Sequence, residues 1–385
     1  MDDLPKDILV IILILCPIKS IYLINKRFNL LCNDDFLWES RFIHDYGLSE
    51  ASDQNLMSWK NEYKHYGKFT RLDSNLNEQL RAKAISCGMF YTMIIDLDNN
   101  LWGFGNNREG QLGLGDNQEK SEPSQVHNLK VKTVSCGKSH TMVIDMYDQL
   151  WGFGCNYQGQ LGFNSEYCHL TSERIGISPK VKAVSCGGTF TIVIDMDNNV
   201  WSFGNNFYGQ LGLGDRVKRT TATLISGIKA KSVHCGDSHT LVIDTDDNIW
   251  GFGWNLYGQL GLGDNQDRSI PTRLQHWSCK KKIKEISCGN YHSIIIDTDN
   301  NTFGFGYNSH KQLEQSEHEY IYFPTQMMDA KSIYAGYDYS VIIDLDDNVW
   351  IFGDNHHKQI KELKAKSISG GNNHIMVMLH PSFFT

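Results

Sequence analysis

Short apolar segments alternate with polar turns along most of the chain. Residues 141–145 (TMVID) and residues 150–154 (LWGFG) form one such pair, separated by the segment MYDQ. Short apolar runs with β-branched members predict strands, and Asp and Asn between such runs predict tight turns. The pattern therefore indicates a β-rich protein built of hairpins.

These hairpins belong to a repeat. The triplet Ser-Cys-Gly, or a weaker form of it, ends at the glycines at positions 88, 137, 187, 236, 289, 336 and 371. A period of about 50 residues built from strand-like segments is typical of propellers and related arrays. The second strand of each hairpin is followed by the motif GQLG, which the last two units lack.

A large aromatic residue occupies one repeated site in the second strand of each hairpin. A ring beside glycines suits sheets that pack face to face with their backbones close together. We therefore assign a structural role to this site, which contains Trp102, Trp151, Trp201, Trp250, Phe303 and Trp350.

Histidine also has a repeated site, three residues after the glycine of the triplet. The same site holds Tyr91, Phe190 and Tyr339 in other units. A site that alternates between histidine and other rings is filled for its shape, so packing is favoured over metal binding or nucleophilic catalysis. His140, His239 and His292 are therefore interpreted as structural.

Two other motifs resemble ligand sites. The segment GKS at residues 137–139 lacks the earlier glycine of a phosphate-binding loop. The segment DLDNN at residues 96–100 resembles the start of a calcium loop but lacks the later glycine and glutamate, so a hairpin turn with left-handed Asn is favoured and calcium remains the alternative. The sequence thus predicts no enzyme activity, no metal and no cofactor.

The composition argues against several classes of protein. The net charge is −8, and neither the segment up to Phe69 nor the rest of the chain is basic, which disfavours direct binding to nucleic acid or to a membrane surface. The ten cysteines contain no CxxC pair, so we expect reduced thiols in a cytoplasmic or nuclear protein. The apolar run at residues 8–16 (ILVIILILC) is shorter than the about 20 residues of a transmembrane helix, and its flanks do not match a secretion signal.

The motif CGxxHTxxID, followed by LWGFGxNxxGQLGLGD, resembles the regulator of chromosome condensation repeat family over residues 69–380. The resemblance implies a mainly β fold, with a seven-bladed β-propeller over residues 69–385. The chain has seven repeat starts but six Trp or Phe strands, so we expect an N-terminal strand to complete the last blade. Residues 69–72 (FTRL) are the candidate, because they match residues 271–274 (PTRL), which end a unit.

Residues 1–68 have a different pattern. Apolar residues at 8, 11, 12 and 15 follow a helical spacing, with Pro5 suited to the start of the helix and Pro17 to its end. The order LPxD, then Lys-Arg-Phe, then Leu-Trp resembles the F-box, a small α-helical module that docks on the Skp adaptor of a cullin ubiquitin ligase. The resemblance implies an F-box domain whose adaptor-binding surface contains Leu4, Pro5, Ile8, Leu9, Ile12, Leu15, Phe28 and Trp38.

An F-box joined to a propeller implies a non-catalytic substrate receptor that works as a monomer within a Skp-cullin complex. Its propeller would hold a protein target near the ligase, and the variable polar loops after GQLG, at residues 116–120, 215–219 and 264–268, are candidates for contacting that target. One alternative is a guanine-nucleotide exchange factor for a Ran-type small GTPase, although the repeat lengths leave no room for a large inserted wedge. Another is a scaffold with an inactive F-box.

Overall fold

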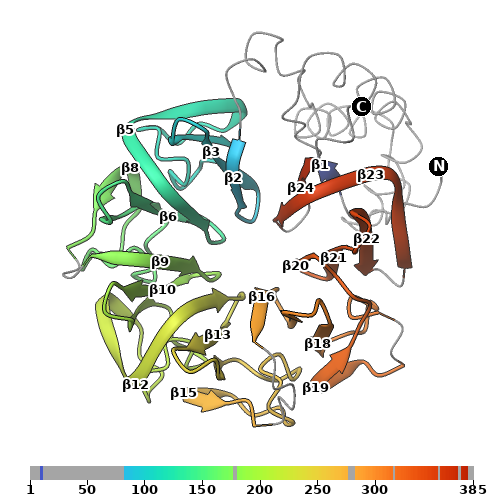
Figure 1. Ribbon diagram of the computed structural model, residues 1–385. Coiled ribbons are helices and arrows are strands. Elements are labelled where there is room, and N and C mark those ends of the chain that lie inside the picture. The colour runs from blue at the N-terminus through green and yellow to red at the C-terminus, as the bar shows by residue number, and fades with distance from the viewer. Residues whose placement is uncertain are drawn as a thin grey trace, which may run out of the picture.

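The structure is a computed structural model that describes residues 9–11, 82–176, 180–275, 282–314, 317–353, 356–371 and 374–379. Every element within these residues is a β-strand, and the strands form sheets arranged in a ring (Figure 1). Within the same residues, no helix is long and apolar enough to cross a membrane. The ring of sheets confirms the mainly β, propeller-like part of the predicted fold.

The repeated unit consists of four antiparallel strands. In the first unit these are β2 (Ala82–Cys87), β3 (Tyr91–Asp96), β4 (Asn100–Gly105) and the first part of β5 (Lys120–Cys136). Strand β5 pairs with β4 through Val126 and then with the next unit through Val131. One long strand is therefore the outer strand of one unit and the inner strand of the next.

The other units follow the same order. The second unit adds β6 (His140–Asp145), β7 (Leu150–Gly154) and β8 (His169–Arg174). The third contains β9 (Val181–Cys186), β10 (Phe190–Asp195), β11 (Asn199–Gly204) and the start of β12 (Arg219–Cys235), and the fourth continues from β12 into β13 (His239–Asp244), β14 (Ile249–Gly253) and β15 (Arg268–Arg273).

The fifth unit contains β16 (Ile283–Cys288), β17 (His292–Asp297), β18 (Thr302–Tyr307) and β19 (Tyr320–Gln326). The sixth contains β20 (Ser332–Ala335), β21 (Tyr339–Ile343), β22 (Asn348–Gly353) and the start of β23 (His356–Gly370). The end of β23 pairs with β24 (His374–Leu379) in the last unit.

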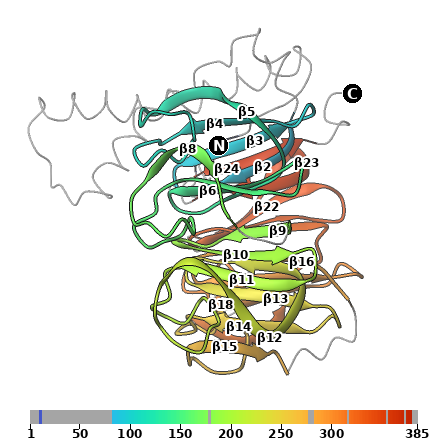
Figure 2. The same cartoon turned by 90° about the vertical axis from the view of Figure 1, so that its left-hand side faces the viewer.

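The second strand of a unit is buried along its whole length, as β3 and β10 show. Figure 2, turned by 90°, shows that sheets of neighbouring units stack face to face, so both faces of this strand are covered. A strand covered on both faces requires a continuous apolar run rather than an alternating one. This explains segments such as TMVID in the sequence.

The hydrophobic core is divided among the junctions between neighbouring sheets. At the first junction, Leu101 of one sheet packs in the same cluster as Val143 and Phe153 of the next. A Cβ on Gly113, in the GQLG motif, would lie 2.9 Å from the Phe153 ring, so this glycine is required by close packing. Fully buried rings at the equivalent sites are Phe203, Phe252, Phe305 and Phe352.

The repeated tryptophans are partly buried, and each is held by an aspartate. In the third unit, Trp201 Nε1 donates to Asp195 Oδ2 at 2.9 Å, while Asp195 Oδ1 accepts the backbone N–H groups of Asp197 and Asn199 at 2.9 and 2.8 Å. One carboxylate thus closes the hairpin and orients the indole. The same bond, 2.7–2.9 Å long, is made by Trp102, Trp151, Trp250 and Trp350, and Phe303 occupies the equivalent site in the fifth unit.

The predicted hairpin turns are confirmed. Asn99, Asn198 and Asn300 have φ values of 62°, 66° and 70°, in the left-handed region that Asn tolerates. Because both carboxylate oxygens of Asp195 already accept hydrogen bonds within the turn, the hairpin is favoured over a calcium loop.

The last and first units contact each other and close the ring. Met376 of β24 packs with Ile94 and Phe104 of the first unit. Thr92 Oγ1 and His374 Nε2 lie 3.1 Å apart across the same junction. Ring closure therefore uses side-chain packing like that at the other junctions.

The N-terminal segment departs from its prediction. Residues Leu9–Ile11 form strand β1, which pairs in parallel with β24, with Leu9 opposite His374. The predicted helix is therefore wrong at these residues. The β-branched Val10 and Ile11 favour an extended backbone, and the edge of β24 offers N–H and C=O groups for pairing.

Most of the predicted adaptor-binding surface lies outside the described residues. The same holds for the predicted closing strand at residues 69–72. The adaptor-binding residues concerned are Leu4, Pro5, Ile8, Ile12, Leu15, Phe28 and Trp38.

Candidate functional site

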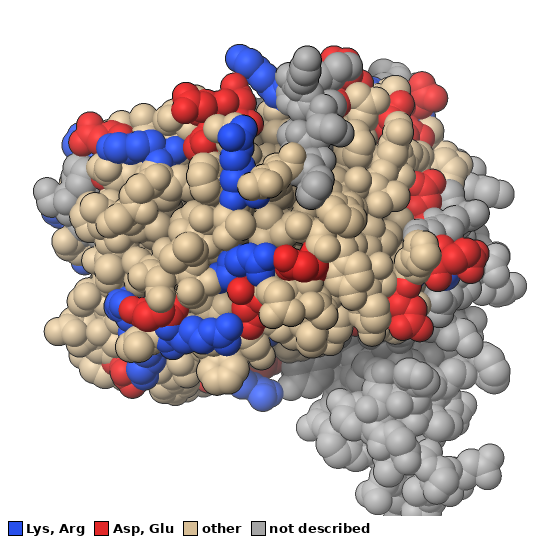
Figure 3. Space-filling model, turned by 90° about the horizontal axis from the view of Figure 1, so that it is seen from below, with Lys and Arg blue, Asp and Glu red and all other residues tan. Residues whose placement is uncertain are grey.

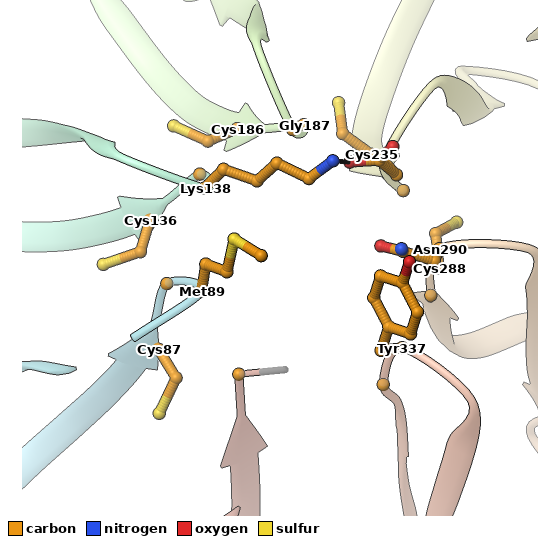
Figure 4. A pocket seen from close by; sticks show the side chains of 18 of the residues that line it. Cys87, Met89, Cys136, Lys138, Cys186, Gly187, Cys235, Cys288, Asn290 and Tyr337 are labelled. Carbon is orange, nitrogen blue, oxygen red and sulfur yellow. Dashed lines mark ion pairs between the residues drawn. The ribbon is translucent and has the colours of Figure 1, made fainter. Parts of the chain in front are cut away.

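The turns between the first and second strands meet around the axis of the ring and enclose a hollow of about 90 Å³ (Figure 4). Its wall is built from the repeated Cys-Gly pairs and from the residue that follows each glycine. These following residues differ from unit to unit, and they are Met89, Lys138, Gly188, Asp237, Asn290 and Tyr337. The hollow therefore combines a repeated backbone with variable side chains.

Backbone hydrogen bonds join the turns around the hollow. The N–H of Met89 donates to the carbonyl of Lys138 at 3.3 Å, the N–H of Lys138 donates to Gly188 at 3.1 Å, and the series continues to the sixth unit. A Cβ on Gly137 would lie 2.2 Å from the His140 ring. The glycine of the repeated triplet is thus required by the close approach of neighbouring groups.

An ion pair crosses the hollow between the second and fourth units. Lys138 Nζ lies 2.7 Å from Asp237 Oδ1, and the Asp237 side chain is only 14% exposed (Figure 4). The nearby Nδ2 of Asn290 is buried without a hydrogen-bond partner among the described residues. Since an unpaired buried donor is costly, this amide offers a hydrogen bond to a bound group.

The repeated cysteines line the hollow, but their sulfur atoms point away from it (Figure 4). Cys136 Sγ donates to the Ser86 carbonyl at 3.3 Å, and Cys186 Sγ donates to the Ser135 carbonyl at 3.2 Å. Burial raises the pKa of the Cys136 thiol to about 11. Such protonated thiols join one unit to the preceding one and are poor nucleophiles.

The three repeated histidines are fully buried within the junctions. Their Nε2 atoms lie 2.9–3.1 Å from a Ser or Thr hydroxyl of the next unit. Burial lowers the pKa of His140, His239 and His292 to about 3, so each imidazole is neutral at pH 7. The structure places them on separate junctions, and within the part of the chain that the structure describes they belong to no metal-ligand set. The hydroxyls beside them are buried, and those of Thr191 and Ser293 donate to backbone carbonyls.

A cluster of aromatic side chains lies beside the hollow. It occupies the turns between first and second strands and between third and fourth strands, which antiparallel pairing brings to one face of the ring. Tyr208 stacks on Trp254 with ring centroids 5.0 Å apart, and Trp254 lies 5.5 Å from Tyr291. Tyr291 in turn hydrogen-bonds Tyr337 at the wall of the hollow, 3.2 Å between hydroxyls. The aromatic face consists of Phe207, Tyr208, Trp254, Tyr257, Tyr291, Tyr307, Tyr320 and Tyr337.

Carboxylates lie next to this aromatic face. Asp338 is partly buried, and burial raises its pKa, although the charge of the nearby His310 acts in the opposite direction. Burial, the hydrogen bond with Tyr337 and the charges of Asp237 and Asp338 together raise the pKa of Tyr291. Aromatic rings beside negative charge form an environment suited to a cationic group.

The polar loops after GQLG are tied down by ion pairs. Within them, Asp116 pairs with Lys120 at 2.8 Å, and Arg216 pairs with Asp267 of the next loop at 3.2 Å. Figure 3 shows Lys and Arg interspersed with Asp and Glu on the side of the ring that it draws. The role predicted for these loops in target recognition stays a prediction. In the third and fourth units the aromatic residues Tyr208 and Tyr257 directly precede GQLG and so lie outside these loops.

The family profile described as RCC1-like domain matches residues 50–331, well over half of the chain. The chain belongs to this family. This confirms the propeller half of the resemblance seen in the sequence. No curated protein sequence matches the chain.

Solved structures agree with the RCC1-like fold. Human WBSCR16 superposes with a TM-score of 0.69 at 20% identity, over 78% of this chain and 87% of that chain. Yeast RCC1 (Prp20), solved bound to Kap60, has a TM-score of 0.67 at 19% identity, over 78% of this chain and 81% of that chain. Prp20p from Saccharomyces cerevisiae, studied with its binding to Gsp1p and histones, has a TM-score of 0.67 at 19% identity, over 78% and 83% of the two chains. At these identities the likeness concerns the fold.

The sequence analysis of this RCC1-like chain missed the aromatic face, although the repeat contains a signal for it. Tyr208 and Tyr257 directly precede GQLG in the third and fourth units. Trp254 and Tyr307 directly follow GFG in the fourth and fifth units. Aligning the repeats and comparing the variable positions across neighbouring units would have shown these residues.

Proposed function

We propose that this RCC1-like chain is a non-catalytic receptor whose propeller binds a protein target and whose N-terminal region couples it to a Skp-cullin ubiquitin ligase in the cytoplasm or nucleus. The observation that carries the proposal is the aromatic face beside the hollow. Tyr and Trp are enriched where proteins bind one another, because they offer large contact areas at a low cost in side-chain entropy.

The surroundings of the aromatic face narrow the class of target. The half-buried carboxylate of Asp338 beside Tyr337, and that of Glu319 preceding Tyr320, add negative charge next to ring faces. An Arg or Lys side chain of the target would gain both an ion pair and cation–π contacts there. The face therefore suits a protein segment that presents a basic residue.

Replacing Tyr257 by Ala is expected to weaken target binding strongly, because its ring contacts four other rings of the face. Truncating an aromatic hot spot commonly costs about 2 kcal/mol or more, or roughly 30-fold in affinity. The measurement is quantitative capture of cross-linked targets by the wild type and the variant. Tyr147→Ala is the matched control, since Tyr147 is 72% exposed in a turn between second and third strands, on the opposite face. Equal capture by the Tyr257 variant and the wild type would exclude the aromatic face.

The ligase part of the proposal rests on the sequence of residues 4–42. Since Leu9–Ile11 pair with β24, docking of these residues as an F-box helix requires that β1 leave the sheet edge. The double variant Leu4→Ala with Pro5→Ala is expected to lose binding to a Skp adaptor at least tenfold while the propeller stays folded, because interface anchors of this kind commonly contribute about 2 kcal/mol. Binding is measured with the purified adaptor, and Lys6→Ala serves as the polar control.

The rival functions give different outcomes in the same preparations. If the wild type does not bind the adaptor, the scaffold is favoured. The fold likeness to yeast RCC1 (Prp20) makes the exchange factor the other candidate. A nucleotide-release assay on Ran-type GTPases is expected to show no acceleration, and release at catalytic concentrations of the chain would replace the receptor by the exchange factor.

A further inference from the structure

Two thiols and a carboxylate meet at the junction between the first and second units. Three atoms lie within 4.8 Å of one another, namely Cys155 Sγ, Cys168 Sγ and a carboxylate oxygen of Glu109. Cys168 Sγ donates to Glu109 Oε2 at 2.8 Å. All three residues are partly buried, so they are reachable by a small ion and shielded from bulk solvent.

The backbone of the repeat brings these three positions together, and comparable positions also meet at another junction of the ring. Glu109 directly precedes GQLG, Cys155 directly follows GFG, and Cys168 directly precedes the fourth strand of its unit. At the junction of the fourth and fifth units Tyr257 precedes GQLG, Tyr307 follows GFG, and Tyr320, the first residue of β19, pairs with Tyr307. The centroids of these three rings lie 5.1–6.0 Å apart. The meeting point is thus a property of the fold, and the residue types decide what it binds.

We propose that Glu109, Cys155 and Cys168 form a Zn²⁺ site that links the first two units of the propeller. Thiolate and carboxylate are both zinc ligands, whereas Mg²⁺ and Ca²⁺ require sets of oxygen ligands. Three protein donors of a tetrahedral ion leave the fourth position for water or for a donor from a partner.

The neighbouring histidine is not part of the set. His169 Nδ1 lies 2.9 Å from Glu173 Oε1, and its Nε2 lies 3.3 Å from Ser165 Oγ. Both ring nitrogens are therefore engaged within the second unit. The ligand set stays two sulfurs and one carboxylate.

Zinc binding exchanges protons for the metal at this site. In the absence of a cation, burial, together with the hydrogen bond to Glu109, raises the pKa of Cys168 to about 12, and burial also raises the pKa of Cys155. Each thiol releases its proton to solvent when its sulfur bonds Zn²⁺, and no electron is transferred. The site is distinct from the aromatic face, so it stands or fails independently of the proposed function.

The test uses the full chain, reduced and freed of metal. Titration with Zn²⁺ in a calorimeter is expected to show a single ion bound per chain, and Co²⁺ is expected to give a thiolate charge-transfer band. Cys155→Ser and Cys168→Ser should abolish both signals, and Glu109→Gln should weaken binding at least tenfold. Cys136→Ser is the matched control, because Ser can keep the hydrogen bond from residue 136 to the Ser86 carbonyl.

A second measurement uses only the wild type, so it does not depend on whether the variants fold. Zn²⁺ is expected to protect Cys155 and Cys168 from alkylation, read by peptide mass, while the other thiols react as before. The site is refuted if the double variant Cys155→Ser with Cys168→Ser binds Zn²⁺ like the wild type. It is also refuted if Zn²⁺ leaves the alkylation of both thiols unchanged.

Discussion

Acidification from about pH 7 to about pH 4.5 is expected to unfold the propeller, because buried neutral imidazoles must become charged. Burial lowers the pKa of His140, His239 and His292 to about 3, and that of His234 and His374 to about 4. In the unfolded chain these groups titrate near about 6.5. The unfolded state therefore binds more protons between these values, so stability is fully present above about pH 6.5 and is lost as the pH falls towards 3.

The expected size of the acid effect is large. Each histidine contributes about 1.4 kcal/mol per pH unit within its window. At a pH about two units below the pKa of an unfolded histidine, His140, His239 and His292 together lower the free energy of unfolding by up to about 8 kcal/mol. This loss is comparable with the total stability of a folded protein, which is about 5–15 kcal/mol. The Nδ1 atoms of His239 and His292 have no hydrogen-bond partner among the described residues, so no acceptor there supports the charged form. At His140 a backbone contact with Phe190 favours the charged form, but burial outweighs it and the pKa stays low.

Denaturant unfolding followed by tryptophan fluorescence at several pH values measures this dependence. The chain itself suggests the replacement to test, because Tyr91 and Tyr339 occupy the same repeat site as the histidines. Replacing His140, His239 and His292 by Tyr should move the acid midpoint to lower pH. An unchanged midpoint in that triple variant would show that other groups govern acid unfolding.

The second large effect is expected from Asp195→Ala, which should lower the free energy of unfolding by about 3–5 kcal/mol. Asp195 is fully buried and accepts hydrogen bonds from two backbone N–H groups, from Asn199 Nδ2 and from Trp201 Nε1. Although burial acts to raise its pKa, the bonds from Trp201 and Asn199 outweigh it and the pKa of Asp195 is lowered. Removing the carboxylate leaves these donors without their acceptor.

Thermal unfolding of Asp195→Ala measures this cost. Asp197→Ala is the matched control, because the Asp197 side chain is exposed in the same turn while its backbone N–H still reaches Asp195. The control is expected to change the stability by less than about 0.5 kcal/mol. If both variants unfold at the same temperature, the carboxylate does not hold the hairpin.

The asparagine and the aspartate of the hairpin turns show what could and could not be predicted from the sequence. Asn at the turn was predicted with its left-handed conformation, because that preference belongs to the residue itself. The Asp–Trp bond was not predicted, since it joins side chains six residues apart across the hairpin, whereas turn and strand signals each belong to a shorter segment. The tryptophan site was found, but the fully buried ring at the junction is Phe153 or its equivalent.

Residues far apart in the sequence were beyond the reach of the repeat pattern. Tyr208, Trp254 and Tyr291 belong to three different units and meet only because antiparallel pairing places their turns on one face. The predicted helix at the N-terminus failed at Leu9–Ile11 for a related reason. Helical spacing is a local signal, whereas the free edge of β24 is created by the folded ring.

The sequence by itself determined the repeated unit of this protein, because apolar runs, turn-forming Asn and Asp, and close-packed glycines act on neighbouring residues along the chain. Only the tertiary structure decided which units face each other and what their junctions contain. The Lys138–Asp237 ion pair joins the second and fourth units, and Glu109 meets Cys155 and Cys168 where the first two units pack together. Such contacts depend on the positions of whole sheets in space, which no period along the chain encodes.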